Sequence, residues 1–152
     1  MPSDMTSPAN NSPSDHHAYR PPDLPDDWYE RFEHGIAEFN EGKFYDCHET
    51  LERCWQEQGR LAAPMEDPHR QWVQGVIQIA VGFHHLERDN VKGALKLFER
   101  GLARIKKFPL ITYPLKSGPL EAVVKSTIDE LTALGEPASG QVKMPCPKIE
   151  HK

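Results

Sequence analysis

The stretch from about residue 69 to residue 88 constrains the fold of this chain more than any other segment. If it is helical, apolar side chains surround most of its circumference: Trp72, Val73, Val76, Ile77, Ile79, Ala80, Val81, Phe83 and Leu86. A surface helix has a single apolar stripe, whereas a helix that is apolar on most sides must be buried. The sequence therefore predicts a central helix that other helices cover.

Four further segments have the single apolar stripe of amphipathic helices, at about residues 26–41, 44–58, 91–108 and 118–134. Asp26 or Asp27 suits the N-cap of the first segment, and Asn90 is placed to cap the fourth of the five helices. Gly59 is predicted to end the second. Sustained alternation of apolar and polar residues is absent, so no sheet is expected. We predict an all-α, single-domain bundle of about five helices, built from antiparallel helical hairpins.

Both ends of the chain are rich in residues that disfavour regular structure. Residues 1–25 contain many prolines and serines, and residues 136–152 are interrupted by prolines and a glycine. Such segments bury too little apolar surface to offset the entropy lost on ordering. We therefore expect a disordered arm over 1–25, a helical domain over 26–135 and a loose or loosely docked tail over 136–152.

Charge and hydropathy restrict the partners that we expect. The net charge of −5 makes nucleic acid an improbable partner, because phosphate contacts need a basic face. No apolar run approaches the roughly 20 residues of a membrane span, and the first 25 residues lack a signal-peptide pattern. Cys47 and Cys54 would lie about 10 Å apart on a helix, too far for a disulfide. A cytoplasmic protein with no membrane contact is expected.

A faint internal repeat relates the first two predicted helices to the next two. Residues 39–43 resemble residues 86–90, and at the same offset of 47 positions Leu51 aligns with Phe98. Each unit is predicted to be a helix, a tight turn and a second helix, as in tetratricopeptide-like hairpins.

One group of polar residues has the spacing that chemistry would need. Four polar residues lie within a sector about 100° wide on the 44–58 helix: Tyr45, His48, Glu49 and Glu52. Trp55 lies where this sector meets the apolar stripe. His48 and Glu52 are four residues apart, so their side chains can meet. An imidazole and a carboxylate so placed can share a divalent metal ion or form a hydrogen-bonded pair.

The 69–88 helix has a matching polar stripe. It contains Gln74, Gln78 and His85, while His84 points closer to the apolar face. If the two helices pack together, His48 and Glu52 are expected to face Gln78 and one of the two histidines. The sequence leaves open whether that histidine is His84 or His85.

At these residues the chain resembles a known family, the bacterial and archaeal domain of unknown function 309. The family marker, His-x-x-x-Glu-x-x-Trp/Tyr, is matched by His48, Glu52 and Trp55. The similarity covers roughly residues 28–108. It implies an all-helical domain and suggests a metal site at the marker, but it implies no reaction.

The sequence is compatible with two functions. The favoured one is a non-catalytic interaction module, in which the His48–Glu52 pair is a structural polar cluster that sets helix packing. Its partner would be another protein or a second copy of the chain. The alternative is a protein that binds a divalent metal or a small ligand, such as a metal-dependent hydrolase, with Glu49 or His85 as a further ligand or general base.

Overall fold

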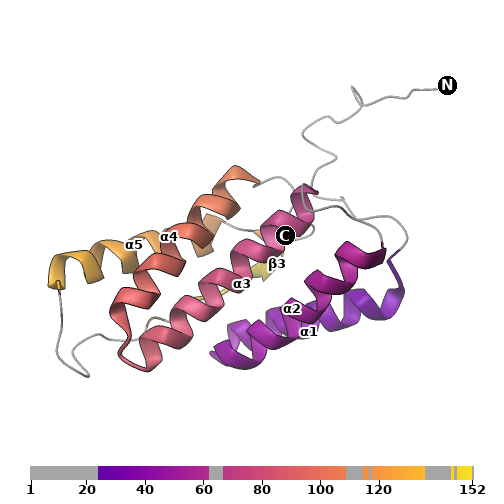
Figure 1. The fold of residues 1–152 in the computed structure, drawn as a ribbon, viewed down its shortest axis with the longest axis horizontal. Helices are drawn as coiled ribbons and strands as arrows, with labels where there is room; N and C mark the ends of the chain where they lie inside the picture. The colour runs from indigo at the N-terminus through magenta and orange to yellow at the C-terminus, as the bar shows by residue number, and fades with distance from the viewer. Residues whose placement is uncertain are drawn as a thin grey trace.

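The computed structural model describes residues 24–61, 67–108, 115–116, 118–135, 145 and 147–151. These residues form five helices: α1 (Asp26–Asn40), α2 (Phe44–Leu61), α3 (Pro68–Glu87), α4 (Val91–Lys107) and α5 (Gly118–Leu134) (Figure 1). Two short strands, β2 (Leu115–Lys116) and β3 (Glu150–His151), form an antiparallel ladder of two residues each. The predicted all-α fold is confirmed. Most of the predicted N-terminal arm, and residues 136–144 of the predicted tail, lie outside the described residues.

Helix α3 is the centre of the bundle, as its apolar circumference predicts. It packs against α2 on one side and α4 on the other, while α1 packs on α2 and α5 on α4 (Figure 1). The ring of Phe83 illustrates this position, because it lies 6.3 Å from Phe39 of α1, 5.0 Å from Phe44 of α2 and 4.7 Å from Phe98 of α4. Within the described ranges, no helix has both the length and the apolar character that a membrane span requires.

The internal repeat is visible in the turns that close the two hairpins. Gly42, between α1 and α2, has a φ of +79°, and Asp89, at the equivalent place between α3 and α4, has a φ of +59°. The helix after the second turn is capped as predicted, since the side chain of Asn90 accepts a hydrogen bond from the N–H of Gly93 at 3.0 Å. A residue with a left-handed backbone conformation therefore closes each hairpin.

The repeat also places a glycine at a close contact between the two helices of each hairpin. A Cβ on Gly35 would lie 2.6 Å from the side chain of Leu51, and a Cβ on Gly82 would lie 2.7 Å from the ring of Phe98. The second pair is the first pair shifted by 47 positions, the offset of the sequence repeat. The two hairpins thus share one packing arrangement, in which a glycine on the first helix accepts a large side chain from the second.

Two predicted helix boundaries are wrong. Helix α2 continues through Gly59 to Leu61, because Gly59 makes room for a neighbour instead of ending the helix. A Cβ at that position would lie 2.3 Å from the guanidinium of Arg70. Helix α1 has Pro25 at its N-cap, and no side chain caps it. Asp26 and Asp27 lie in its first turn instead, where carboxylates stabilise the positive end of the helix dipole.

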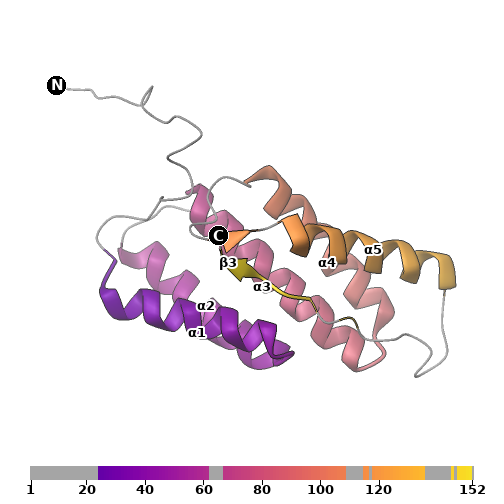
Figure 2. The same ribbon diagram turned by 180° about the vertical axis from the view of Figure 1, so that it is seen from behind.

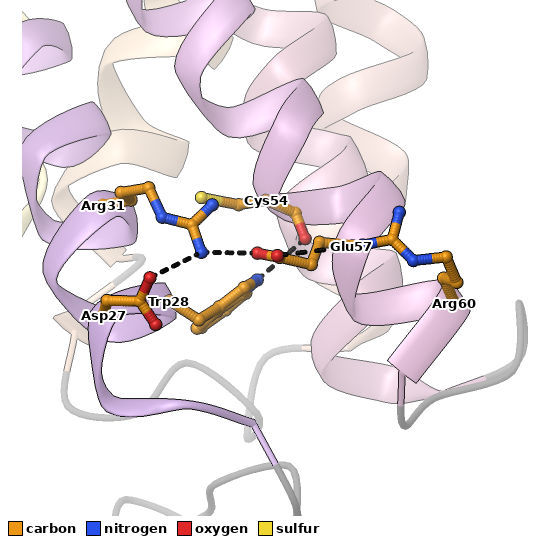
Figure 3. A network of polar contacts seen from close by, with 6 residues as sticks. All are labelled: Asp27, Trp28, Arg31, Cys54, Glu57 and Arg60. Carbon is orange, nitrogen blue, oxygen red and sulfur yellow. Dashed lines mark hydrogen bonds and ion pairs between the residues drawn. The ribbon is translucent and has the colours of Figure 1, made fainter.

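A polar network joins α1 to α2 (Figure 3). Arg31 donates to Glu57 at 2.6 Å and lies 3.5 Å from Asp27. Beside it, the indole N–H of Trp28 donates to the backbone oxygen of Cys54 at 2.8 Å. The largest side chain of α1 is thereby buried without leaving its N–H group unpaired.

The end of the chain is attached to the turn between α1 and α2. The amide side chain of Asn40 pairs in both directions with Ile149, accepting from its N–H at 2.7 Å and donating to its carbonyl at 2.9 Å. The side chain of Ile149 is buried, and Lys148 donates to the backbone oxygen of Asn40 at 2.6 Å. In Figure 2 the β2–β3 pair lies between α1 and α5. Residues 147–151 are therefore docked on the bundle, through contacts that no sequence pattern indicated.

Asn40→Ala is expected to lower the free energy of unfolding by about 1–2 kcal/mol, because it removes both amide contacts to Ile149. Urea denaturation followed by circular dichroism measures this change. Glu41→Ala is the matched control, since Glu41 is an exposed neighbour in the same turn. Equal midpoints for both variants and the wild type would show that the tail adds nothing to stability.

Candidate functional site

The predicted His48–Glu52 pair lies on the outer surface of α2. Nε2 of His48 is 3.5 Å from Oε1 of Glu52, and 27% and 40% of their side chains are exposed. Exposed pairs of this kind typically contribute between zero and about 1 kcal/mol. The two side chains do meet, but they meet where water reaches them.

Tyr45 connects this pair to α3. Its ring centroid lies 5.8 Å from that of His48 on its own helix and 5.3 Å from that of His84 on α3. Its hydroxyl lies 3.3 Å from Glu49, and 49% of the residue is exposed. His84 in turn lies 3.6 Å from Glu87. We use the name Tyr45 patch for this surface, which consists of Tyr45, His48, Glu49, Glu52, His84 and Glu87.

Two residues predicted for the cluster lie elsewhere. Gln78 accepts a hydrogen bond from Arg104 of α4 at 3.3 Å, and Nδ1 of His85 lies 3.2 Å from the side-chain amide of Asn90. Gln78 and His84 are six residues apart on α3, so their side chains point in directions about 120° apart around the helix axis. His84 is therefore the histidine beside the cluster, and Gln78 faces α4 instead of α2.

Trp55, the third residue of the family marker, joins the end of α2 to the start of α3. The guanidinium of Arg70 lies 3.9 Å from the centroid of the Trp55 ring, and its Nε donates to the Trp55 carbonyl at 3.2 Å. The backbone N–H of Arg70 donates to the side chain of Asp67, the N-cap of α3, at 3.0 Å. Trp55 therefore has a packing role at the junction of α2 and α3.

The interface of α2 and α3 also contains a buried polar pair that the sequence did not indicate as a site. Nε2 of Gln58 is 3.0 Å from Nδ1 of His69, and both residues are buried. The His69 ring packs 6.0 Å from Trp28 and 5.8 Å from Phe32. Burial lowers the pKa of His69 to about 4, so the ring is neutral at pH 7. A histidine three residues before Trp72, on the apolar side of α3, was the signal in the sequence.

The buried neutral state of His69 predicts a loss of stability in acid. Between pH 6.5 and about 4 the unfolded chain binds a proton on this histidine that the folded chain does not, so stability falls as the pH drops through that range. We expect His69 to contribute about 2–3 kcal/mol to this fall. Urea denaturation at pH 7 and pH 4.5 measures it, with His69→Phe as the variant that lacks the titrating ring. Equal acid losses in the wild type and the variant would contradict the assignment.

The described residues provide few ligands for a metal. Among them, no group of three or more His, Cys, Asp or Glu side chains is arranged to hold an ion. The His48–Glu52 pair supplies two donors, whereas protein zinc sites use three or four. Burial raises the pKa of the Cys54 thiol to about 11 and also raises that of Cys47, so neither thiol is ionised at pH 7. This set does not fit a closed or catalytic metal centre.

Part of the chain, including the Tyr45 patch, matches a family model. Residues 32–97 match the family model described as a domain of unknown function, DUF309. The resemblance inferred from the family marker is therefore confirmed. The DUF309 match extends from α1 into α4 and includes His48, Glu52 and Trp55.

The chain is also similar to a protein of Bacillus subtilis (strain 168). The uncharacterized protein YpuF is 35% identical over 68 residues, which are 44% of this chain and 36% of YpuF. The matched region thus spans about a third of the relative. Its printed name supplies no ligand or activity, so the geometry of the DUF309 region is the basis for a function.

Proposed function

We propose that this protein is a non-catalytic interaction module and that the Tyr45 patch is its contact surface. One observation carries the proposal: a half-exposed tyrosine ring lies between two histidine rings from neighbouring helices. Tyrosine is enriched among the residues that dominate binding energies at protein interfaces. Because its neighbours already restrict the Tyr45 ring, little conformational entropy remains to be lost on binding.

The chemistry around Tyr45 favours a partner segment that contains lysine or arginine. Glu49 lies beside the Tyr45 hydroxyl, and Glu52 and Glu87 lie beside the two histidines that flank the ring. A cation placed over the exposed aromatic face gains from the ring quadrupole and from the adjacent negative charges. The proposed partner is therefore a protein with a basic segment.

The exposure of His48 and Glu52 supports a role in binding more than one in holding the fold. Other contacts join α2 to α3, namely the Trp55–Arg70 stack and the buried Gln58–His69 pair. In this proposal the DUF309 marker has two parts: Trp55 supports the helix interface, while His48 and Glu52 belong to the surface that a partner contacts.

Site-specific photo-crosslinking in the source cells tests the proposal. A photoreactive phenylalanine analogue is placed at position 45, and the control has the same analogue at Lys125, an exposed position on α5. We expect a discrete protein adduct from position 45 that the control lacks. Adding Glu52→Lys should reduce its yield at least fivefold, because it reverses a charge at the border of the patch.

The alternatives give different outcomes. An adduct between two copies of the chain would identify the partner as a homo-oligomer. Adducts from position 45 that match those from position 125, or that persist unchanged with Glu52→Lys, would contradict an interaction surface at the patch.

A further inference from the structure

Helix α4 has an unusual charge for this protein. The chain as a whole has a net charge of −5, yet α4 contains six cations and one anion. Arg100, Arg104 and Lys107 are spaced by four and three residues, so they lie along one side of the helix. This basic side is on the opposite flank of α3 from the Tyr45 patch, because α4 and α2 pack on different sides of α3 (Figure 1).

The basic side of α4 borders a hollow. A cleft of about 570 Å³ is lined by Gln71 of α3, by Arg100, Ala103, Arg104 and Lys107 of α4, and by Phe108 directly after the helix. Ligand clefts in proteins typically measure about 300–1,000 Å³. The lining combines cationic groups with one aromatic ring and one methyl group, which suits an organic anion.

Arg104 is held in place by neutral partners. Its Nε donates to Oε1 of Gln78 at 3.3 Å, and a terminal nitrogen donates to Oε1 of Gln71. Two amide oxygens thus fix the plane of the guanidinium without neutralising it. Three of its five N–H groups remain for a further acceptor.

No described carboxylate pairs with the cations of the cleft. In the part of the chain that the structure describes, the ion pairs involve none of Arg100, Arg104 and Lys107. Cations separated by three or four residues on a helix repel one another, so this arrangement costs stability. The helix dipole explains cations in the last turn, but Arg100 lies about two turns before the end of α4.

We propose that this cleft binds a small organic phosphate, such as one with a diphosphate group. The fork of Arg104 would accept two phosphate oxygens, as guanidinium groups do, while Arg100 and Lys107 add charge on either side. The Phe108 ring and Ala103 would contact the organic part. A long nucleic acid fits less well, because it would extend from the cleft over a molecule of net negative charge.

Isothermal titration calorimetry on the full chain tests this site, with pyrophosphate and ADP as probes at 150 mM salt. We expect saturable 1:1 binding that Arg104→Gln and Arg100→Gln each weaken at least tenfold. Arg104→Lys should be intermediate, because it keeps the charge and loses the fork. Lys92→Gln is the matched control, since it removes one charge from the same helix outside the cleft.

Several results would overturn the proposal. These are the absence of saturable binding to either probe, an equal loss of affinity with Lys92→Gln, or full affinity in Arg100→Gln. Arg100→Gln keeps the test decisive even if Arg104→Gln misfolds, because no hydrogen bond to Arg100 supports the described fold. Tighter binding to single-stranded oligonucleotides, rising with their length, would assign the cleft to nucleic acid instead.

Discussion

Ala80→Asp is expected to abolish cooperative folding. Ala80 has no exposed surface and lies in α3, the helix that the rest of the bundle covers. An unpaired carboxylate at a buried position costs several kcal/mol, which is comparable with the whole stability of a domain of this size. Thermal denaturation followed by circular dichroism should show no transition, and gel filtration should show an expanded or aggregated chain.

The control for this change is Ala122→Asp, which introduces the same group at an exposed position of α5. That variant should unfold within a few degrees of the wild type, because surface substitutions usually change stability by about 0.5 kcal/mol or less. A folded Ala80→Asp variant with a normal midpoint would contradict the central position of α3.

Gly101→Leu is expected to lower the free energy of unfolding by more than about 3 kcal/mol. Helices α3 and α4 are in close backbone contact at this residue. A Cβ on Gly101 would lie 2.8 Å from the carbonyl oxygen of Gly75 and 2.7 Å from Cγ1 of Ile79. Because one of these neighbours is backbone, a side chain can be accommodated only if the two helices move apart.

Urea denaturation measures the effect of Gly101→Leu. Gly118→Leu is the matched control, because a Cβ on Gly118 would meet nothing within 4 Å and the residue is also helical. We expect the control to change stability by less than about 1 kcal/mol. Similar losses in both variants would show that the effect arises from helix propensity and side-chain exposure instead of the α3–α4 contact.

The helices were predictable because their apolar periodicity is strong, whereas interactions between distant residues were not. The all-round apolar character of α3 indicated its central position without knowledge of any contact. Gly59 was misinterpreted because a helix stop and a close approach require the same residue type. The position of the Arg70 side chain against Gly59 shows that here the glycine serves a close approach. The docking of Ile149 on Asn40 joins residues that are 109 positions apart, and no local pattern predicts such a contact.

For the candidate site, spacing along a single helix predicted which residues share a face. His48 and Glu52 meet, as the four-residue separation requires. The position of one helix face relative to the next was not predictable, so Gln78 was expected at the cluster although it bonds Arg104. Tyr45 was recognised as part of the polar sector, but its contact with His84 depends on how α2 and α3 are aligned.

We propose that His48 and Glu52 form a surface for a partner and have no structural or metal-binding role. Thermal denaturation of the wild type and of the double variant His48→Ala/Glu52→Gln tests it directly, with each protein measured in a chelator and in excess Zn²⁺ or Mn²⁺. We expect the two proteins to differ by less than about 1 kcal/mol, and the metals to stabilise neither selectively. Metal stabilisation of the wild type that the double variant lacks, or a loss of several kcal/mol in the chelator, would contradict the claim.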